Sequence, residues 1–478
     1  MPDKYSAEIA CDICIIGAGS AGLSVAAAAA QLGARTVLVE RGAMGGDCLN
    51  TGCIPSKSLI AAALHARMAR GDTRFGLAVR VPRIDFSKVH GRIRRVIETI
   101  APHDSVERFE GLGVQVIKES ARFIGKDMLS AGNHRIKARR FVVATGSRPV
   151  LPPVPGLAEA RPMTNESIFD LAKLPDHLMI IGGGPIGLEM AQAFRRLGSK
   201  VTVFDRSRIL PKDEPEAAAI ARECLTAEGV ELLEESELIE VRKSSGYEID
   251  AKVNGVARTF RGSHILVAAG RAPVIAGLGL ETAGIKMGER GIEVDKHLTT
   301  SNSKVFAIGD VAGGPQFTHI AAYQAGIVVR NALFWLPAKV DYRALPWVTY
   351  LDPEIAHVGL TEEEARKTTH SVETLSLPYS QNDRAQTEGR VEGMIKLILG
   401  GRGKVLGVTI VGPHAGEAIS VWGLVISKRL PLSAVAGMIM PYPTLSEISK
   451  RAAGAYYSTR LFSDRVRAVV RFIQRWLP

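Results

Sequence analysis

Two cysteines stand close together in the glycine-rich stretch Gly45-Gly-Asp-Cys48-Leu-Asn-Thr-Gly-Cys53-Ile-Pro-Ser-Lys57. The glycines let the backbone leave a straight helix, so the two sulfur atoms can approach disulfide distance. We expect a helix to begin near Pro55, and a helix N-terminus lowers the pKa of a thiol and makes its thiolate reactive. The alternative is two free core cysteines. The glycines and the nearby Lys57 favour a redox-active pair.

A glycine unit precedes the cysteines, between two predicted strands at residues 13–16 and 36–40. Gly17 permits the tight turn, Gly19 lets the backbone approach a pyrophosphate, and Gly22 lets helix and strand pack closely. Glu40 ends the second strand, where a carboxylate can accept hydrogen bonds from a ribose. A glycine turn without a ligand is the alternative, but the strand, helix and terminal acid together favour a dinucleotide site.

The same pattern returns 165 residues later, with Gly182, Gly184 and Gly187 after an apolar strand at 178–181. A second echo joins residues 142–149 to 266–273. Repetition of both segments predicts two related dinucleotide-binding domains, and two dinucleotides in one chain indicate electron or hydride transfer between them.

Asp205 ends the second strand of this later unit. A carboxylate there accepts a hydrogen bond from a free 2′-hydroxyl and repels a 2′-phosphate, which favours NAD(H) over NADP(H). Arg206 and Arg208 follow directly, and their positive charges weaken this preference for NAD(H).

Composition limits the remaining function classes. The chain has 478 residues and a net charge of +11, and its average hydrophobic and charged fractions exclude wholesale disorder and a multispanning membrane protein. Five cysteines are too few for a disulfide-stapled secreted scaffold. Nowhere do 18 consecutive apolar residues occur, and no targeting segment is visible, so we expect a cytoplasmic location.

With these motifs, the chain resembles the flavoprotein pyridine nucleotide-disulfide oxidoreductases, which include dihydrolipoamide dehydrogenase, glutathione reductase and mercuric reductase. The resemblance covers about residues 10–450, and its motifs keep the family's order and spacing. Besides the cysteine stretch and the two glycine units, they are residues 144–146, 305–310, 352–359 and 443–447.

The resemblance implies an α/β fold with two Rossmann-like dinucleotide-binding domains and a C-terminal α+β dimerisation domain. Residues 1–150 and 271–345 would bind FAD, residues 151–270 would bind NAD(P), and residues 346–450 would form the interface of a homodimer whose active site is shared. Beyond the part that the resemblance covers, the spacing of apolar residues and arginines predicts a basic amphipathic helix over residues 451–478. The first glycine unit, Glu40, Thr145, Gly146 and Asp310 would hold FAD, and the second unit, Asp205 and Gly270 would hold NAD.

The resemblance also implies catalytic roles. Cys53 would be the charge-transfer thiolate against the flavin, and Cys48 the exposed interchange thiol. Lys57 would lie near flavin N5 and pair with Glu189. A helix beginning near Thr318 and His319 would direct its N-terminal dipole at the flavin and stabilise negative charge there.

The acceptor end departs from the dehydrogenase pattern. Where the family has a histidine before Pro-Thr, paired with a glutamate, this chain has Tyr442 with Glu447. A phenol with a reference pKa near 10 is poorly suited as a base at neutral pH, which puts efficient dithiol exchange in doubt. Tyrosine here resembles mercuric reductase, although that enzyme's C-terminal vicinal cysteines are absent. The alternative is that Tyr442 only packs at the interface.

The last residues carry much of the positive charge, with seven basic residues and one acid from Lys450 to Pro478. Apolar residues recur at helical spacing from Leu461 to Leu477, with arginines between them. Packing against its own domain or dimer mate is one interpretation of this helix. An anionic membrane surface at the inner membrane, or an acidic partner protein, is the other. Nucleic acid is not expected as a partner.

We therefore predict an FAD-dependent, NAD(P)H-linked disulfide oxidoreductase that acts on a small dithiol or disulfide. One alternative is a mercuric reductase-like enzyme that reduces metal ions or small electrophiles with the same cysteine pair. Another is a redox component of a larger assembly, recruited by the C-terminal tail. No metal cofactor is expected.

Overall fold

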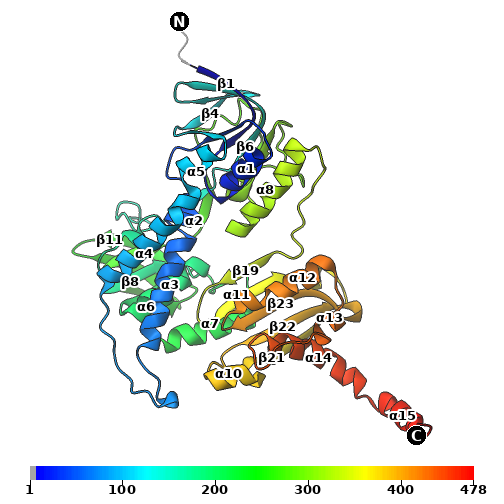
Figure 1. Cartoon of the computed structure of the whole chain (residues 1–478). Helices are drawn as coiled ribbons and strands as arrows, with labels where there is room; N and C mark the ends of the chain where they lie inside the picture. Colours follow the sequence, from blue (N-terminus) through cyan, green and yellow to red (C-terminus); the bar gives the residue numbers. More distant parts are fainter. Residues whose placement is uncertain (1–6, 478) are drawn as a thin grey trace.

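The computed structural model describes residues 7–477, of which residues 459 and 460 are described by their backbone alone. Three lobes and a projecting C-terminal helix make up the chain (Figure 1). The first dinucleotide domain lies at the top, the second at the lower left and the C-terminal domain at the lower right.

A mainly parallel sheet forms the centre of the first domain. Its order is β3-β2-β1-β6-β5-β4, and β18 also pairs with β6 although it comes much later in the chain. The strands are β1 (Ala7–Ile16), β2 (Thr36–Val39), β3 (Val114–Ile117), β4 (Ala121–Gly125), β5 (Met128–Ala131), β6 (His134–Val143) and β18 (Val305–Ala307). The predicted strand at 36–40 is one residue shorter than expected, because it ends before Glu40. Residues 305–310, whose apolar run before an acid predicts a buried strand, are extended only over Val305–Ala307, because a 3-10 turn begins at Gly309.

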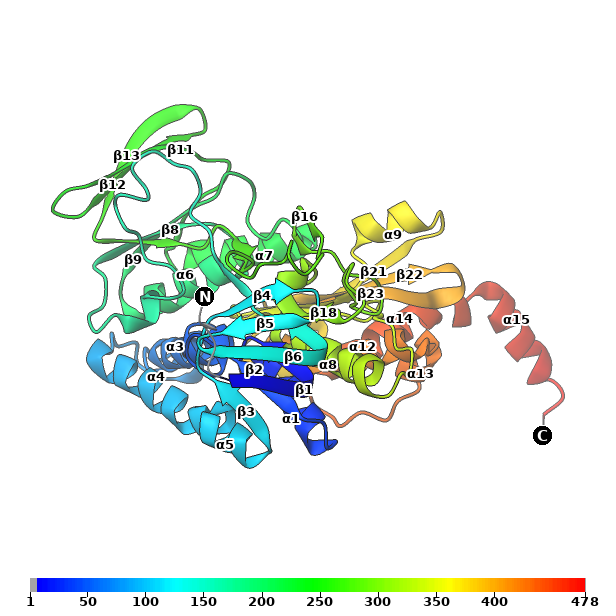
Figure 2. The same cartoon turned by 90° about the horizontal axis from the view of Figure 1, so that it is seen from above.

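Helices cover this sheet and extend from it. Helix α1 (Ser20–Gln31) packs against α8 (Thr318–Leu333) through small residues such as Ala26 and Ala325, which let the two helices lie close together on one face (Figure 2). The others are α2 (Gly46–Asn50), α3 (Cys53–Met68), α4 (Phe86–Ile100) and α5 (Val106–Gly111).

The second domain has a four-stranded parallel sheet of order β10-β9-β8-β14, beside a separate antiparallel sheet β11-β12-β13. Its elements are β8 (His177–Ile181), α6 (Pro185–Leu197), β9 (Lys200–Phe204), α7 (Pro215–Ala227), β10 (Glu231–Leu233), β11 (Glu237–Lys243), β12 (Tyr247–Val253), β13 (Val256–Gly262) and β14 (His264–Val267). Two short antiparallel strands, β7 (Ser147–Pro149) and β15 (Arg271–Pro273), connect it to the first domain.

One hydrophobic core runs across the boundary between these domains. Leu59 of α3, Phe86 of α4 and Phe194 of α6 belong to the same buried cluster. The helix that carries Cys53 is therefore fixed against the second domain as well as the first.

The C-terminal domain is a five-stranded antiparallel sheet of order β19-β20-β23-β22-β21. Its elements are β19 (Pro346–Thr349), β20 (Glu354–Gly359), α9 (Glu362–Thr368), β21 (Glu373–Pro378), α10 (Asp383–Glu388), β22 (Met394–Gly400), β23 (Lys404–Gly412), α11 (Ala415–Ala418), α12 (Ser420–Lys428), α13 (Leu432–Ala436) and α14 (Glu447–Leu461). Every residue of β22 is buried, and Lys396 in it is neutralised by contacts of 2.7 Å to Glu214 and Glu362. The predicted α+β character of this region is confirmed.

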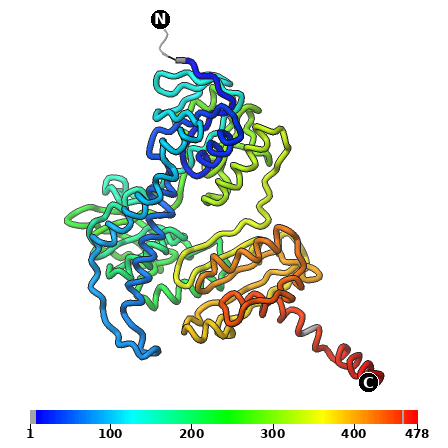
Figure 3. Tube along the Cα trace, viewed as in Figure 1, coloured from blue at the N-terminus to red at the C-terminus, as the bar shows by residue number. Residues whose placement is uncertain are grey.

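The tail differs from the single helix that was predicted. Helix α14 ends at Leu461 and a second helix, α15 (Asp464–Ile473), follows. Ser463 has an extended backbone and stands just before Asp464, the first residue of the new helix. Serine favours the position before a helix, so Ser463 interrupts the helical run of the tail. The trace in Figure 3 shows the chain ending away from the body of the molecule. Across residues 7–477, no helix is both long enough and apolar enough to cross a bilayer.

Candidate redox site

The two cysteines lie on consecutive helices that meet at a glycine corner. Cys48 is in α2, and Cys53 is the first residue of α3. The prediction that this helix begins near Pro55 was therefore wrong by two residues, because the non-helical backbone of Gly52 ends the turn earlier. This places the Cys53 sulfur in the first turn, where unpaired backbone N–H groups and the helix dipole favour an anion.

Hydrogen bonding separates the two thiols chemically. The hydrogen bond from Cys48 is the main cause that lowers the pKa of Cys53 to about 6, against a loss of solvation on burial, and Thr318 and Lys57 add to the effect. The Thr318 hydroxyl lies 3.4 Å from the Cys53 sulfur. The same bond, together with burial, raises the pKa of Cys48. Cys53 is thus the thiolate at neutral pH and Cys48 the thiol that donates to it.

The predicted contact between Lys57 and Glu189 is confirmed. Lys57 Nζ lies 2.8 Å from Glu189 Oε2, and the backbone N–H of Tyr350 donates to Glu189 Oε1 at 2.9 Å. The ammonium also lies 4.4 Å from the centre of the Tyr350 ring. Glu189 is only 5% exposed, so its charge requires these partners. Residues from all three domains therefore meet beside Cys53.

The first glycine loop has the geometry that a dinucleotide needs. Gly17 has φ +104°, and a Cβ on Gly22 would lie 1.8 Å from the carbonyl oxygen of Gly17. A Cβ on Gly19 would meet nothing within 4 Å, so open space lies against the backbone there. Glu40 accepts hydrogen bonds of 2.6 Å from the N–H groups of Ala18 and Gly42. The Glu40 carboxylate therefore holds the loop in place, and it lies where the ribose of a dinucleotide is expected.

The second loop repeats this arrangement closely. Gly182 has φ +119°, a Cβ on Gly187 would lie 1.9 Å from its carbonyl oxygen, and a Cβ on Gly184 would meet open space. Asp205 accepts 2.6 and 2.7 Å hydrogen bonds from the N–H groups of Gly183 and Ser207. Both loops therefore leave space for a pyrophosphate beside a helix N-terminus, which fits FAD and a nicotinamide dinucleotide.

Other predicted cofactor residues gather where the two domains join. Asp310 accepts a 2.5 Å hydrogen bond from Ser147, and Arg271 donates to that hydroxyl at 2.7 Å. Thr145 donates to the carbonyl oxygen of Val274 at 2.7 Å. Gly146 and Gly270 flank this region with φ +69° and +134°, backbone conformations that glycine adopts readily.

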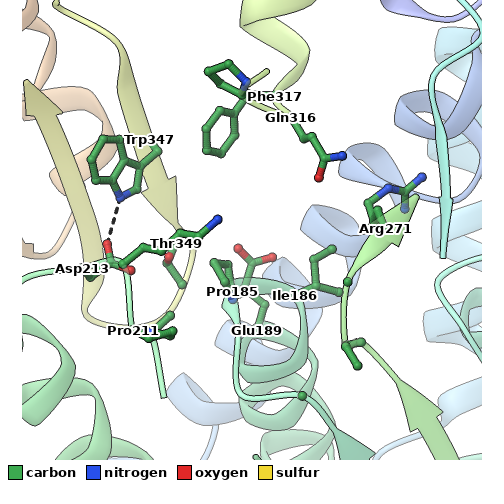
Figure 4. Close-up of a pocket in the computed structure, with 18 of the residues that line it drawn as sticks. Pro185, Ile186, Glu189, Pro211, Asp213, Arg271, Gln316, Phe317, Trp347 and Thr349 are labelled. Carbon is green, nitrogen blue, oxygen red and sulfur yellow. Dashed lines mark hydrogen bonds between the residues drawn. The ribbon is translucent and has the colours of Figure 1, made fainter. Parts of the chain in front are cut away.

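A single cavity of about 2740 Å³ joins the cysteines to the second glycine loop. Its walls include Cys48, Cys53, Lys57, Glu189, Gly182, Gly184, Asp205, Gly270, Asp310 and His319. Figure 4 shows Glu189, Ile186 and Arg271 around this space, with Trp347 donating a 2.9 Å hydrogen bond to Asp213. The cavity therefore connects an electron donor bound at the second glycine loop to the cysteine pair without interruption.

The N-terminus of helix α8 lies at the same cavity. Thr318 is its first residue, and His319 Nε2 donates to the carbonyl oxygen of Pro346 at 2.9 Å. The His319 ring also stacks on Phe317 at 5.2 Å. The predicted start of this helix is confirmed.

Tyr442 and Glu447 lie apart from the cysteines within one chain, and neither lines the cavity in the described residues. Tyr442 is 68% exposed, and its hydroxyl donates to Asp383 at 2.9 Å. Arg451 lies 3.0 Å from Asp383 and 3.4 Å from Glu447. The hydrogen bond to Asp383 is the main cause that raises the pKa of Tyr442.

Three of these contact residues were not predicted as members of the site. Tyr350 and Asp383 have no motif of their own, and Thr318 was predicted only as a helix start. Tyr350 lies two residues before the Asp352-Pro-Glu segment, but nothing in that spacing indicates a contact with Glu189. Such contacts follow only from the packing of three domains.

Comparison with known proteins agrees with this architecture. Residues 11–325 match the model of the pyridine nucleotide-disulphide oxidoreductases, and residues 345–453 match the dimerisation domain of the same group. A mercuric reductase of Streptomyces lividans is 37% identical over 462 residues, which cover 94% of this chain and 96% of that protein. A dihydrolipoyl dehydrogenase of Geobacillus stearothermophilus is 35% identical over 448 residues, with 92% and 94% covered.

Solved structures give the same result. LpdA of Mycobacterium tuberculosis superimposes with a TM-score of 0.84 at 27% identity, covering 93% of this chain and 99% of that one. RclA of Escherichia coli, an HOCl-induced flavoprotein disulfide reductase solved as a Cu(II) complex, gives 0.83 at 28% identity with the same coverage. With both of its sequence regions matched and its two glycine loops formed, the chain belongs to the pyridine nucleotide-disulphide oxidoreductase family.

Proposed function

We propose that this FAD-dependent enzyme passes electrons from NADH to a small disulfide through the Cys48–Cys53 pair, in a dihydrolipoyl dehydrogenase-like reaction that is reversible. The observation that carries the proposal is the pair of unequal thiols in one cavity with the second glycine loop. A thiolate and a neutral thiol side by side are what stepwise disulfide exchange requires.

The first glycine loop, Glu40 and Asp310 would hold FAD, and the second glycine loop with Asp205 would hold the nicotinamide dinucleotide. When bound, FAD supplies the two-electron chemistry that links the nicotinamide to the cysteine pair. Lys57, beside Cys53, lowers the pKa of that thiol. The N-terminal dipole of α8 favours negative charge in the same region.

The reduced pair can reduce a disulfide in two balanced steps. The Cys48 sulfur, as thiolate, attacks one sulfur of the acceptor, so a mixed disulfide forms and the first acceptor thiolate leaves. The Cys53 thiolate then attacks the Cys48 sulfur, which releases the second acceptor thiolate and forms the Cys48–Cys53 disulfide. Cys48 must lose its proton first, and Cys53 accepts it along their hydrogen bond. Cys53 then gives this proton to the departing first acceptor thiolate, so that it is again a thiolate for the second step.

The identity of residue 442 favours a second candidate acceptor. The hydrogen bond to Asp383 raises the pKa of the Tyr442 phenol, so it stays protonated at neutral pH and is a poor base for dithiol exchange. A mercuric reductase-like reduction of a soft metal ion or a small electrophile involves no acceptor dithiol, so it needs no base at position 442. This alternative uses the same cysteine pair.

A homodimer would complete the site. The C-terminal domain corresponds to the family's dimerisation domain, and Ile439 and Tyr442 near it are 99% and 68% exposed in the single chain. We propose that Tyr442 and Glu447 are supplied across this interface to the partner's cysteines. Mixing the Cys53→Ser and Tyr442→Ala variants tests this, because a heterodimer would contain one intact site and regain turnover. Absence of regained turnover in verified heterodimers would contradict a shared site.

The nicotinamide preference is proposed from Asp205. Asp205 directly follows β9, and its carboxylate is held by two backbone N–H groups, so its negative charge is fixed where a 2′-phosphate would lie. Steady-state rates with NADH above those with NADPH are expected. The reverse ratio would refute the preference.

One reductive titration tests the main proposal. Anaerobic NADH should produce the long-wavelength thiolate-to-flavin absorbance, and reoxidation with lipoamide, glutathione disulfide and Hg(II) in turn should identify the acceptor class. Cys53→Ser should abolish the band, whereas Cys224→Ser, a matched change of a partly exposed cysteine, should keep it. Survival of the band in Cys53→Ser would remove the basis of the proposal.

We further propose a cytoplasmic location, where reduced nicotinamide and reduced thiols are both available. Attachment at the inner membrane surface is compatible with this location, and helix α15 supplies an element for it. Docking to an acidic protein is the competing role for that helix.

A further inference from the structure

Helix α15 buries none of its residues, which sets it apart from the helix before it. Helix α14 buries Ile448, Ala452, Ala453 and Tyr456 against the C-terminal domain. Beyond the break at Ser463 the chain leaves that domain, and α15 projects from the body in both views (Figures 1 and 2). Intrinsic helix stability is marginal for ten residues, so an amphipathic helix of this length needs a surface against its apolar face.

The apolar side chains of this helix share one face. Val466, Val469, Val470 and Ile473 follow the three- and four-residue spacing of a helical stripe. Exposed aromatic residues lie beyond both ends of the stripe, where Phe462 is 63% and Trp476 is 78% exposed. We call Phe462 and residues 464–477 the tail surface.

The charge of the tail surface is strongly positive. Residues 464–477 contain Arg465, Arg467, Arg471 and Arg475 against the single acid Asp464. Arg467, Arg471 and Arg475 repeat every four residues and therefore lie along the side opposite the valine stripe. Asp464 lies 3.8 Å from Arg467 and offsets part of one charge.

We propose that the tail surface docks on an anionic phospholipid bilayer. An apolar face with aromatic residues, flanked by arginines, suits the boundary between acyl chains and charged headgroups, where both faces are satisfied at once. Arginine also binds phosphate with two parallel hydrogen bonds. A second copy of the tail fits less well, because it would bring four further arginines against the first four.

Co-sedimentation of the full-length, FAD-loaded protein with lipid vesicles tests the proposal. Vesicles of phosphatidylcholine with phosphatidylglycerol should bind the protein, and pure phosphatidylcholine vesicles should bind it much more weakly. The double variant Arg467→Gln/Arg471→Gln should bind anionic vesicles about 25-fold more weakly, since each basic residue near such a surface contributes roughly a factor of five. Val470→Asp/Ile473→Asp should lose binding altogether.

Two controls separate docking from general charge and from misfolding. Arg92→Gln/Arg95→Gln removes the same charge from the exposed side of α4 and should bind vesicles like the wild type. Both tail variants should keep wild-type NADH oxidation, because no residue of α15 is buried or lines the cavity. The fluorescence of Trp476 should shift to the blue with anionic vesicles, and Trp476→Phe should lack this change.

The proposal is overturned if wild type and both tail variants bind anionic vesicles equally, or if none binds. It is also overturned if the wild type, without vesicles, sediments as a larger oligomer than Val470→Asp/Ile473→Asp, because a second copy then covers the stripe. Stoichiometric co-purification of an acidic protein, lost in the same variant, would assign the surface to that partner instead.

Discussion

The hydrogen bond from Cys48 controls the ionisation of Cys53, and two substitutions isolate its effect. Lowering the Cys53 pKa from 9.0 to about 6 corresponds to about 4 kcal/mol of preference for the thiolate, at about 1.36 kcal/mol per pH unit. A hydrogen bond to a charged group contributes about 1.5–3 kcal/mol. Cys48→Ala, which removes the donor, should therefore raise the Cys53 pKa to about 7–8, whereas Cys48→Ser, which keeps an O–H donor, should leave it near 6.

The assay needs no reductant, because in either variant Cys53 has no disulfide partner and remains a thiol under oxidised flavin. The long-wavelength absorbance of the thiolate beside the flavin is followed from pH 5 upward. Because the folded pKa lies below that of an unfolded cysteine, the thiolate also adds stability that is present above pH 9 and is lost as the pH falls through about 6. Coincident titrations of the alanine and serine variants, or a Cys48→Ser midpoint near 9, would refute the assignment.

Three further substitutions test neighbouring parts of the site. Lys57→Met should raise the Cys53 pKa. Because it leaves Glu189 without its cation, it should also lower the free energy of unfolding in urea by about 1–3 kcal/mol, which is less than for a fully buried pair since Lys57 is partly exposed. Unchanged stability would contradict this role of Lys57. Asp205→Asn removes the charge that opposes a 2′-phosphate, so the ratio of kcat/KM for NADPH to NADH should rise about tenfold, and an unchanged ratio would show that Asp205 does not discriminate. Tyr442→His introduces a group that titrates near neutral pH, so lipoamide turnover at pH 7 should exceed that of both the wild type and Tyr442→Phe; equal rates in all three would exclude a base at this position.

Much of the dinucleotide chemistry could be predicted locally. Gly17 and Gly182 need positive φ, and Gly22 and Gly187 have no room for a Cβ, so each loop conformation is encoded within a few residues. The strand, loop and helix around each glycine unit are contiguous in sequence. Their local spacing therefore indicated both dinucleotide sites.

Helix boundaries at the cysteines and in the tail were less predictable. The start of α3 depends on the backbone of Gly52, and the break before α15 depends on Ser463. The periodic apolar pattern continues through that break, so periodicity alone predicted one helix. Whether the apolar stripe of α15 packs against the chain was equally undetermined, because that depends on where α14 directs it.

The sequence by itself determined the cysteine pair, the two dinucleotide loops and the order of the domains, since each rests on the types of residues close together in the chain. Only the tertiary structure decided the ionisation of the pair. The pKa of Cys53 depends first on the hydrogen bond from Cys48 and then on Thr318 from α8 and on Lys57. The Lys57 ammonium contacts Glu189 of the second domain and Tyr350 of the third. Electrostatic and hydrogen-bonding effects act through space over a few ångströms, so residues far apart in sequence add to the reactivity of a motif that is local.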